Sequence, residues 1–145
     1  MDTLIEKIEA LQNSENKLLL VIGQPGSGKS RLINDYSKAT GIPIIDFNKI
    51  FGQVANDNID LLATMKSFLT TYQQKVLLLD NKRILYSKNS KIDLLPFLKE
   101  LSKEVVVVST WNGMIEDGQL THIRSKGPND LIYSVDDGDF EYVLC

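Results

Sequence analysis

The stretch Leu18–Ser30, LLLVIGQPGSGKS, decides the fold of this chain. It joins a continuous apolar run to a glycine-rich turn and then to the start of a helix pattern. An apolar run without polar alternation is typical of a strand that is covered on both faces. The helix pattern continues over residues 29–40, and Gly41 is expected to end it. The order of strand, glycine turn and helix is the setting in which backbone amides can gather around a phosphate group.

Residues 23–30, GQPGSGKS, match the phosphate-binding pattern G-x-x-x-x-G-K-[ST], which is known as Walker A. Glycine tolerates backbone angles that other residues resist, so the amides of this turn can curl around phosphate oxygens. In this interpretation Lys29 contacts the β- and γ-phosphates, and the Ser30 hydroxyl binds Mg²⁺. The predicted nucleotide site consists of Gly23, Gln24, Pro25, Gly26, Ser27, Gly28, Lys29, Ser30 and Arg31.

Strand and helix patterns alternate along the chain up to residue 108. The helix patterns cover 3–12, 58–73 and 92–102, and the further strand patterns cover 42–47, 76–79 and 105–108. Such alternation implies right-handed crossovers and a parallel central sheet. The later segments 119–124, 131–135 and 140–144 predict a short β-rich C-terminal end, with their pairing left open. We expect a single domain, 1–145, with a three-layer α/β P-loop NTPase fold, a mostly parallel sheet in the order 5-1-4-3-2, and no lid domain.

The strand pattern 76–79 ends at Asp80, as in a Walker B segment. A carboxylate at this edge of the sheet is expected to hold Mg²⁺, usually through water. The next residue is Asn81, where many ATPases of this class have a glutamate; asparagine can orient water but cannot accept its proton. Asp46, which ends the second strand at the same edge, is our preferred general base. Glu116 and Asp117, expected in the loop after strand four, are the alternatives.

Polar residues follow the strand pattern 105–108, in the sequence Ser109-Thr110-Trp111-Asn112. Thr110 or Asn112 could contact the γ-phosphate or the attacking water, although a polar turn without such a role is as common. Trp111 is expected to pack in the core rather than to stack on a base.

Composition excludes several classes of protein. The 145 residues include 16 basic and 19 acidic ones, a net charge of −3, which argues against a basic nucleic-acid surface over the whole monomer and leaves direct DNA binding undecided. The lone cysteine, Cys145, cannot form a disulfide within the chain, which fits a reducing cytoplasm. The longest apolar run is too short to cross a bilayer, so we expect a cytoplasmic protein without a membrane partner. A nucleotide-dependent homo-oligomer stays open, with Arg83 and Arg124 as candidate arginine fingers.

Beyond Walker A, the chain resembles the BrxF family, small P-loop proteins of type 3 BREX bacteriophage-defence systems. The resemblance rests on GQPGSGKS at 23–30, LLLDNKRILY at 77–86, VVVVSTWNG at 105–113 and GQLTHI at 118–123. It implies an accessory protein, similar to a reduced AAA+ core, that binds and hydrolyses ATP. Lys29, Ser30 and Asp80 then bind nucleotide and metal. It also implies partners within the BREX system, namely a methyltransferase, a large ATPase and a phosphatase-like protein.

Two other functions stay open. A small-molecule kinase needs several arginines in a closing lid, and the region after residue 108 has only Arg124. A nucleotide-gated interaction module with little hydrolysis is compatible with Asn81. GTP is less expected than ATP, because the guanine-reading pattern Asn-Lys-x-Asp is absent. The leading expectation is therefore a slow or partner-activated ATPase with ATP and Mg²⁺ as cofactors.

Overall fold

The computed structural model describes residues 2–13, 17–24, 26–46, 61–80, 94–122, 131–134 and 140–145. The described helices are α1 (Asp2–Leu11), α2 (Lys29–Thr40), α4 (Leu61–Thr70) and α6 (Leu94–Leu101). The described strands are β1 (Leu18–Gly23), β2 (Ile44–Asp46), β3 (Val76–Asp80), β4 (Val106–Glu116), β5 (Gln119–His122), β6 (Leu131–Ser134) and β7 (Glu141–Leu144). The α/β class with a mostly parallel sheet is confirmed, and so is the β-rich C-terminal end.

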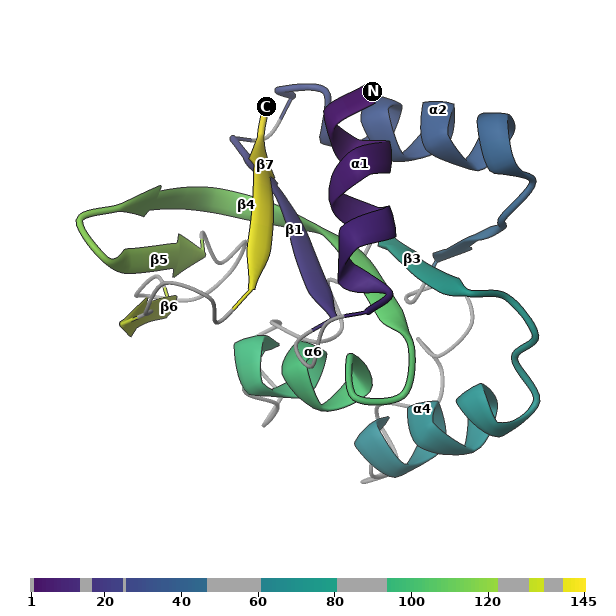
Figure 1. The fold of residues 1–145 in the computed structure, drawn as a ribbon. Coiled ribbons are helices and arrows are strands. Elements are labelled where there is room, and N and C mark those ends of the chain that lie inside the picture. The colour runs from purple at the N-terminus through teal and green to yellow at the C-terminus, as the bar shows by residue number, and fades with distance from the viewer. Residues whose placement is uncertain are drawn as a thin grey trace.

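The central sheet has the order β2-β3-β4-β1-β7, and every neighbouring pair in it is parallel. β1 is buried along its whole length, as its unbroken apolar run predicts. On the side of β1 away from β4 lies β7, the last of the described strands, whereas β5 pairs with β4 and with β6. The glycine turn after β1 and the end of β3 therefore lie at the same carboxyl edge of the sheet, with β4 between them (Figure 1).

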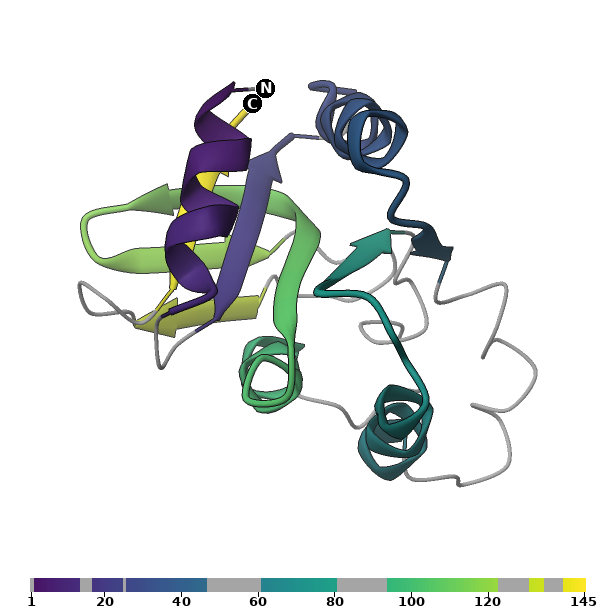
Figure 2. The same ribbon diagram turned by 45° about the vertical axis from the view of Figure 1, so that its right-hand side comes forward.

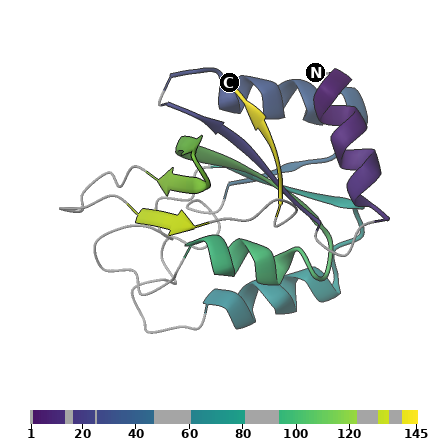
Figure 3. The ribbon, with the colours of Figure 1, turned by 60° about the vertical axis from the view of Figure 1, so that its left-hand side comes forward.

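Helices cover both faces of this sheet, with α1 and α2 on one side and α4 and α6 on the other (Figures 2 and 3). The alternation of side chains along β1 divides the core accordingly. Leu19 and Val21 pack with the residues of α1 and α2, whereas Leu18, Leu20 and Ile22 pack with those of α4 and α6. The described helices are all too short or too polar to span a bilayer.

The end of strand four was predicted wrongly, because β4 runs on to Glu116 instead of ending at residue 108. Its first part pairs with β1 as far as Asn112, and its last part pairs with β5 in an antiparallel hairpin. Asp117 and Gly118 make the turn, with φ of 51° and 76°. Positive φ at both central residues is typical of a tight hairpin whose twist matches that of its strands. Glu116 and Asp117 therefore lie at a hairpin tip and not in a loop at the edge of the parallel sheet.

Candidate functional site

The glycine loop, residues 23–30, leaves β1 and enters α2 at the carboxyl edge of the sheet. Gly26 and Gly28 have φ of 84° and 101°, in a region that side-chain-bearing residues rarely adopt. A side chain at Gly23 is disfavoured for a different reason: a Cβ there would collide with Ser27 Oγ and lie 3.2 Å from the backbone oxygen of Cys145, so the loop would have to shift. Because Gly28 has no side chain to cap α2, the first-turn amides of that helix keep their donors available for a ligand.

Lys29 is the buried cation of this loop, with only 6% of its surface exposed. Its Nζ donates to the backbone oxygen of Gln24 at 2.7 Å and to Ser27 Oγ at 3.5 Å, so the ammonium group lies against the loop itself. Burial lowers the pKa of Lys29, while the negative charges of Cys145 and Asp80 act in the opposite direction. Within the described part of the chain, the hydrogen bonds of this ammonium group go to neutral oxygens of its own loop, and such contacts can be exchanged for an anion.

Three predicted residues meet at the end of β3. Asp80 is the last residue of β3, and Thr110 on β4 donates its hydroxyl to Asp80 Oδ1 at 3.1 Å. Asp46, the last residue of β2, is the register partner of Asp80 on the neighbouring strand. Thr110 is nearly buried, and its register partner on the other side is Val21, two residues before Gly23. Thr110 therefore lies on β4, the strand between Asp80 at the end of β3 and the glycine loop at the end of β1.

The other predicted residues have different positions. Ser30 and Arg31 are exposed in the first turn of α2. Trp111 is fully buried, donates its Nε1 hydrogen to the backbone oxygen of Thr121 at 3.0 Å, and packs edge-on against Tyr133. The expectation that Trp111 packs in the core is thus confirmed, and its ring joins the β4–β5 hairpin to the rest of the molecule. The remaining candidates Pro25, Asn81, Arg83 and Arg124 lie outside the described residues.

The donor set suits magnesium only in part. The hydroxyl of Ser30 and the carboxylate of Asp80 are the hard oxygen donors that Mg²⁺ prefers. Among the described residues, no group of three or more histidine, cysteine, aspartate or glutamate side chains is arranged to hold a metal ion. Magnesium is commonly bound by one or two carboxylates together with waters and substrate phosphates. The residues therefore fit a metal that arrives with a phosphate ligand and not one that the protein holds alone.

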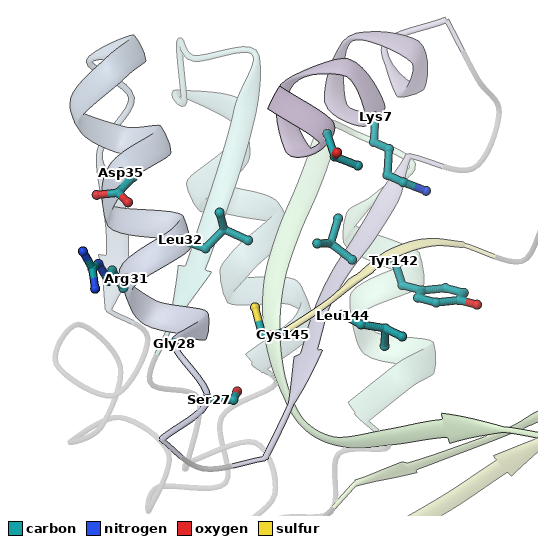
Figure 4. A pocket seen from close by; sticks show the side chains of 11 residues that line it. Lys7, Ser27, Gly28, Arg31, Leu32, Asp35, Tyr142, Leu144 and Cys145 are labelled. Carbon is teal, nitrogen blue, oxygen red and sulfur yellow. The ribbon is translucent and has the colours of Figure 1, made fainter. Parts of the chain in front are cut away.

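A cavity of about 780 Å³ opens beside the glycine loop and was not anticipated from the sequence (Figure 4). Ser27 and Gly28 line it, together with residues of α1, α2 and β7. No local pattern could have indicated it, because α1 and β7 stand at opposite ends of the chain and meet only in the fold. Lys7 of α1 and Glu141 of β7 form an ion pair at 3.1 Å where the two elements meet.

The geometry thus brings a buried lysine, left-handed glycines and a threonine-bound aspartate to one edge of a parallel sheet. This combination can receive a polyanion and a divalent cation next to each other. Comparisons of the chain with family models, with curated proteins and with solved structures find no match.

Proposed function

We propose that the chain is a P-loop protein that binds ATP together with Mg²⁺ at the glycine loop. The observation that carries this proposal is the burial of Lys29, whose ammonium group, within the described residues, donates to two oxygens of the loop. Burying a cation is unfavourable unless a compensating anion is present in the working state. The triphosphate would add direct anionic contacts to the negative charges of Cys145 and Asp80 that already act on Lys29, and the α2 amides and the left-handed glycines would supply neutral donors around it.

Asp80 and Ser30 hold the metal in this proposal, and Thr110 positions the carboxylate. Bound Mg²⁺ neutralises charge on the β- and γ-phosphates during phosphoryl transfer. Thr110 donates its hydroxyl to Asp80 Oδ1, and this hydrogen bond holds the carboxylate at the end of β3, where it would bind the metal or its waters. Thr110 also lies on the strand next to β1, and in this proposal its hydroxyl oxygen is a candidate to contact the attacking water.

Hydrolysis is proposed to be slow and to use Asp46 as the general base. Asp46 stands beside Asp80 in register, at the edge where the γ-phosphate would emerge from the loop. Adjacent parallel strands are about 5 Å apart, so the Asp46 carboxylate is within reach of a water that Asp80 also contacts. If ATP binds and turnover is absent, the protein acts instead as a nucleotide-gated interaction module.

The cellular role is proposed from the resemblance to the BrxF family alone. In that role the chain is an ATP-dependent accessory protein of a BREX phage-defence system, whose other members are its partners. A nucleotide-dependent homo-oligomer is part of the same proposal. Measuring the mass of the protein with and without ATP·Mg²⁺ separates an assembling protein from a monomer that depends on a partner.

Single-turnover hydrolysis of ATP tests the catalytic part. We expect Asp46→Asn to bind ATP as the wild type does and to lose most of its phosphate release, because amide groups cannot accept the proton of water. Asn81→Asp is the companion variant, since it restores an acidic group next to Asp80. Unchanged hydrolysis in Asp46→Asn removes Asp46 as the base, and faster hydrolysis in Asn81→Asp identifies position 81 as the place of the missing base.

A further inference from the structure

β7 is the outer strand of the parallel sheet on the side away from β2, and among the described strands it pairs with β1 alone. The amide of Cys145, directly after β7, donates to the backbone oxygen of Ile22 at 2.8 Å. The backbone groups of a strand point to alternate sides from one residue to the next, so those of Val143 also face β1. The N–H and C=O groups of Tyr142 and Leu144 therefore face outward, at the edge of the sheet.

The same two residues carry exposed apolar side chains. Leu144 is 63% exposed and Tyr142 is 38% exposed, and the only other large apolar residue that is exposed in the described part of the chain is Met114. Residues two apart in a strand share a face, and Figure 4 shows the side chains of Tyr142 and Leu144 on the same side of β7. The charged residue of β7, Glu141, forms an ion pair with Lys7 of its own subunit. This edge thus combines backbone donors and acceptors with apolar side chains, which favours pairing with a further strand.

We propose that the outer edge of β7 pairs with β7 of a second copy of the chain, in an antiparallel arrangement around a two-fold axis. The central sheets of the two copies would join into one continuous sheet, with the β7 strands in its middle. This inference goes beyond the proposed function, because it assigns an interface and needs no nucleotide.

The sequence of β7 is complementary to itself in one register. With the two-fold axis at Val143, Tyr142 stands opposite Leu144 of the second copy. Both residues have outward backbone groups, so each such pair exchanges both of its N–H···O=C bonds. The exposed apolar side chains then meet directly across the interface, on one face. A register centred on Tyr142 would instead set Leu144 against Phe140, which its own subunit already buries. Self-complementarity of this kind is the property of a two-fold interface and favours a second copy as the partner.

The nucleotide sites stay separate in this dimer. β1 and β7 are parallel within one copy, whereas the two β7 strands are antiparallel, so the glycine loops lie at opposite edges of the joined sheet. Each loop is complete within its own copy, and dimer formation and ATP binding are therefore independent properties. The nucleotide-dependent assembly proposed above would add to this dimer.

Sedimentation equilibrium without nucleotide tests the inference on the wild-type chain, for which we expect a dimer in equilibrium with the monomer. Leu144→Lys places a charge opposite Tyr142 at both ends of the interface and should weaken the dimer at least about tenfold. Met114→Lys is the matched control, since it changes an exposed apolar residue of β4 and should dimerise as the wild type does. A wild type that stays monomeric would overturn the inference and leave the proposed ATP binding intact. Equal dimerisation of the two lysine variants would also overturn it.

A disulfide measures the register directly. In the register centred on Val143, Glu141 stands opposite Cys145 of the second copy in a non-hydrogen-bonded pair, whose Cα atoms are about 4.5 Å apart. A disulfide can bridge this distance, and Cys145 is free and exposed. Oxidised glutathione should therefore link Glu141→Cys into a covalent dimer, and it should link neither the wild type nor the control Glu141→Cys/Cys145→Ser. If Glu141→Cys links no faster than these two chains, the proposed pairing is wrong.

Discussion

Lys29 and Asp80 are the residues at which the proposed chemistry is decided. A lysine with 6% exposure is unusual, because burial of an ammonium group favours its neutral form. Here burial does lower the pKa of Lys29, and the nearby negative charges of Cys145 and Asp80 partly restore it. Ionisable groups in which desolvation and a specific charge oppose each other are concentrated at functional sites. The pair therefore links the glycine loop to the end of β3 electrostatically.

The hydrogen bond from Thr110 to Asp80 gives the first prediction. Thr110→Val keeps the shape of the side chain and removes the donor, so Asp80 loses its positioning contact at 3.1 Å. We expect the enhancement of ATP binding by Mg²⁺ to fall about threefold to tenfold, as for the loss of one hydrogen bond worth about 0.5–1.5 kcal/mol. Titration with ATP at zero and saturating Mg²⁺ measures it. Thr110→Ser retains the hydroxyl and should behave as the wild type; equal Mg²⁺ dependence in the valine and serine variants would refute the positioning role.

At the scale of elements, the β4–β5 hairpin is the main feature that the predicted topology lacked. β4 continues without a break from the parallel sheet into the hairpin, and Trp111 lies close to the point where its pairing changes from β1 to β5. The turn depends on Gly118, which has a φ of 76°. Gly118→Ala is expected to lower the free energy of unfolding by about 1–2 kcal/mol, because a Cβ disfavours left-handed backbone. Urea unfolding measures this loss of stability, with Gln119→Ala at the neighbouring exposed position as control. Equal stability of the two variants would show that the turn does not depend on glycine at position 118.

Tyr72, in the segment between α4 and β3, leads to a prediction about how the stability of the fold depends on pH. Tyr72 donates its hydroxyl to the backbone oxygen of Val76 at 2.7 Å, and burial raises the pKa of Tyr72 from 10.0 to about 12. The neutral form is thus favoured in the folded state, so its contribution to stability is complete below pH 10 and is lost as the pH rises from 10 to 12.

Unfolding in urea at pH 9 and pH 11 measures this contribution. The wild type should lose more stability between these pH values than Tyr72→Phe, which has no hydroxyl to ionise. Tyr142→Phe, at an exposed tyrosine of β7, is the control and should keep the wild-type pH dependence. A Tyr72→Phe variant with the same loss as the wild type would show that burial of this hydroxyl is not the cause.

Sequence reasoning succeeded where one local pattern decides one element. α2 extends over 29–40 as predicted, because the glycine loop precedes it and Gly41, with φ of 77°, ends it by donating to Ser37. It failed at strand four, because Ser109 and Thr110 suggested a polar turn, whereas both side chains are buried in the sheet. The Asp117–Gly118 pair is a hairpin signal that could have corrected this. Thr110 and Asp46 were proposed as partners of the site because parallel strands end at one edge, and register does bring both to Asp80.

At the scale of the whole molecule, elements that are far apart in the sequence come together. β7 lies beside β1, and α1 packs near both, so the two ends of the described chain form one wall of the cavity. The cavity was beyond sequence reasoning for this reason, since its residues are separated by more than a hundred positions and share no spacing. Binding of ATP at the glycine loop should stabilise the folded state, by a free energy that grows with the logarithm of the ligand concentration.

The binding of ATP·Mg²⁺ measured by calorimetry tests the central claim most directly. Lys29→Ala removes the buried ammonium, and Lys38→Ala, in the last turn of the same helix, removes an exposed one as a matched control. We predict binding to the wild type and to Lys38→Ala with equal affinity, and binding to Lys29→Ala that is weaker by about tenfold to a hundredfold, as for loss of a charge-assisted hydrogen bond. The claim is contradicted if the wild type gives no heat with ATP, or if Lys29→Ala binds ATP as tightly as Lys38→Ala.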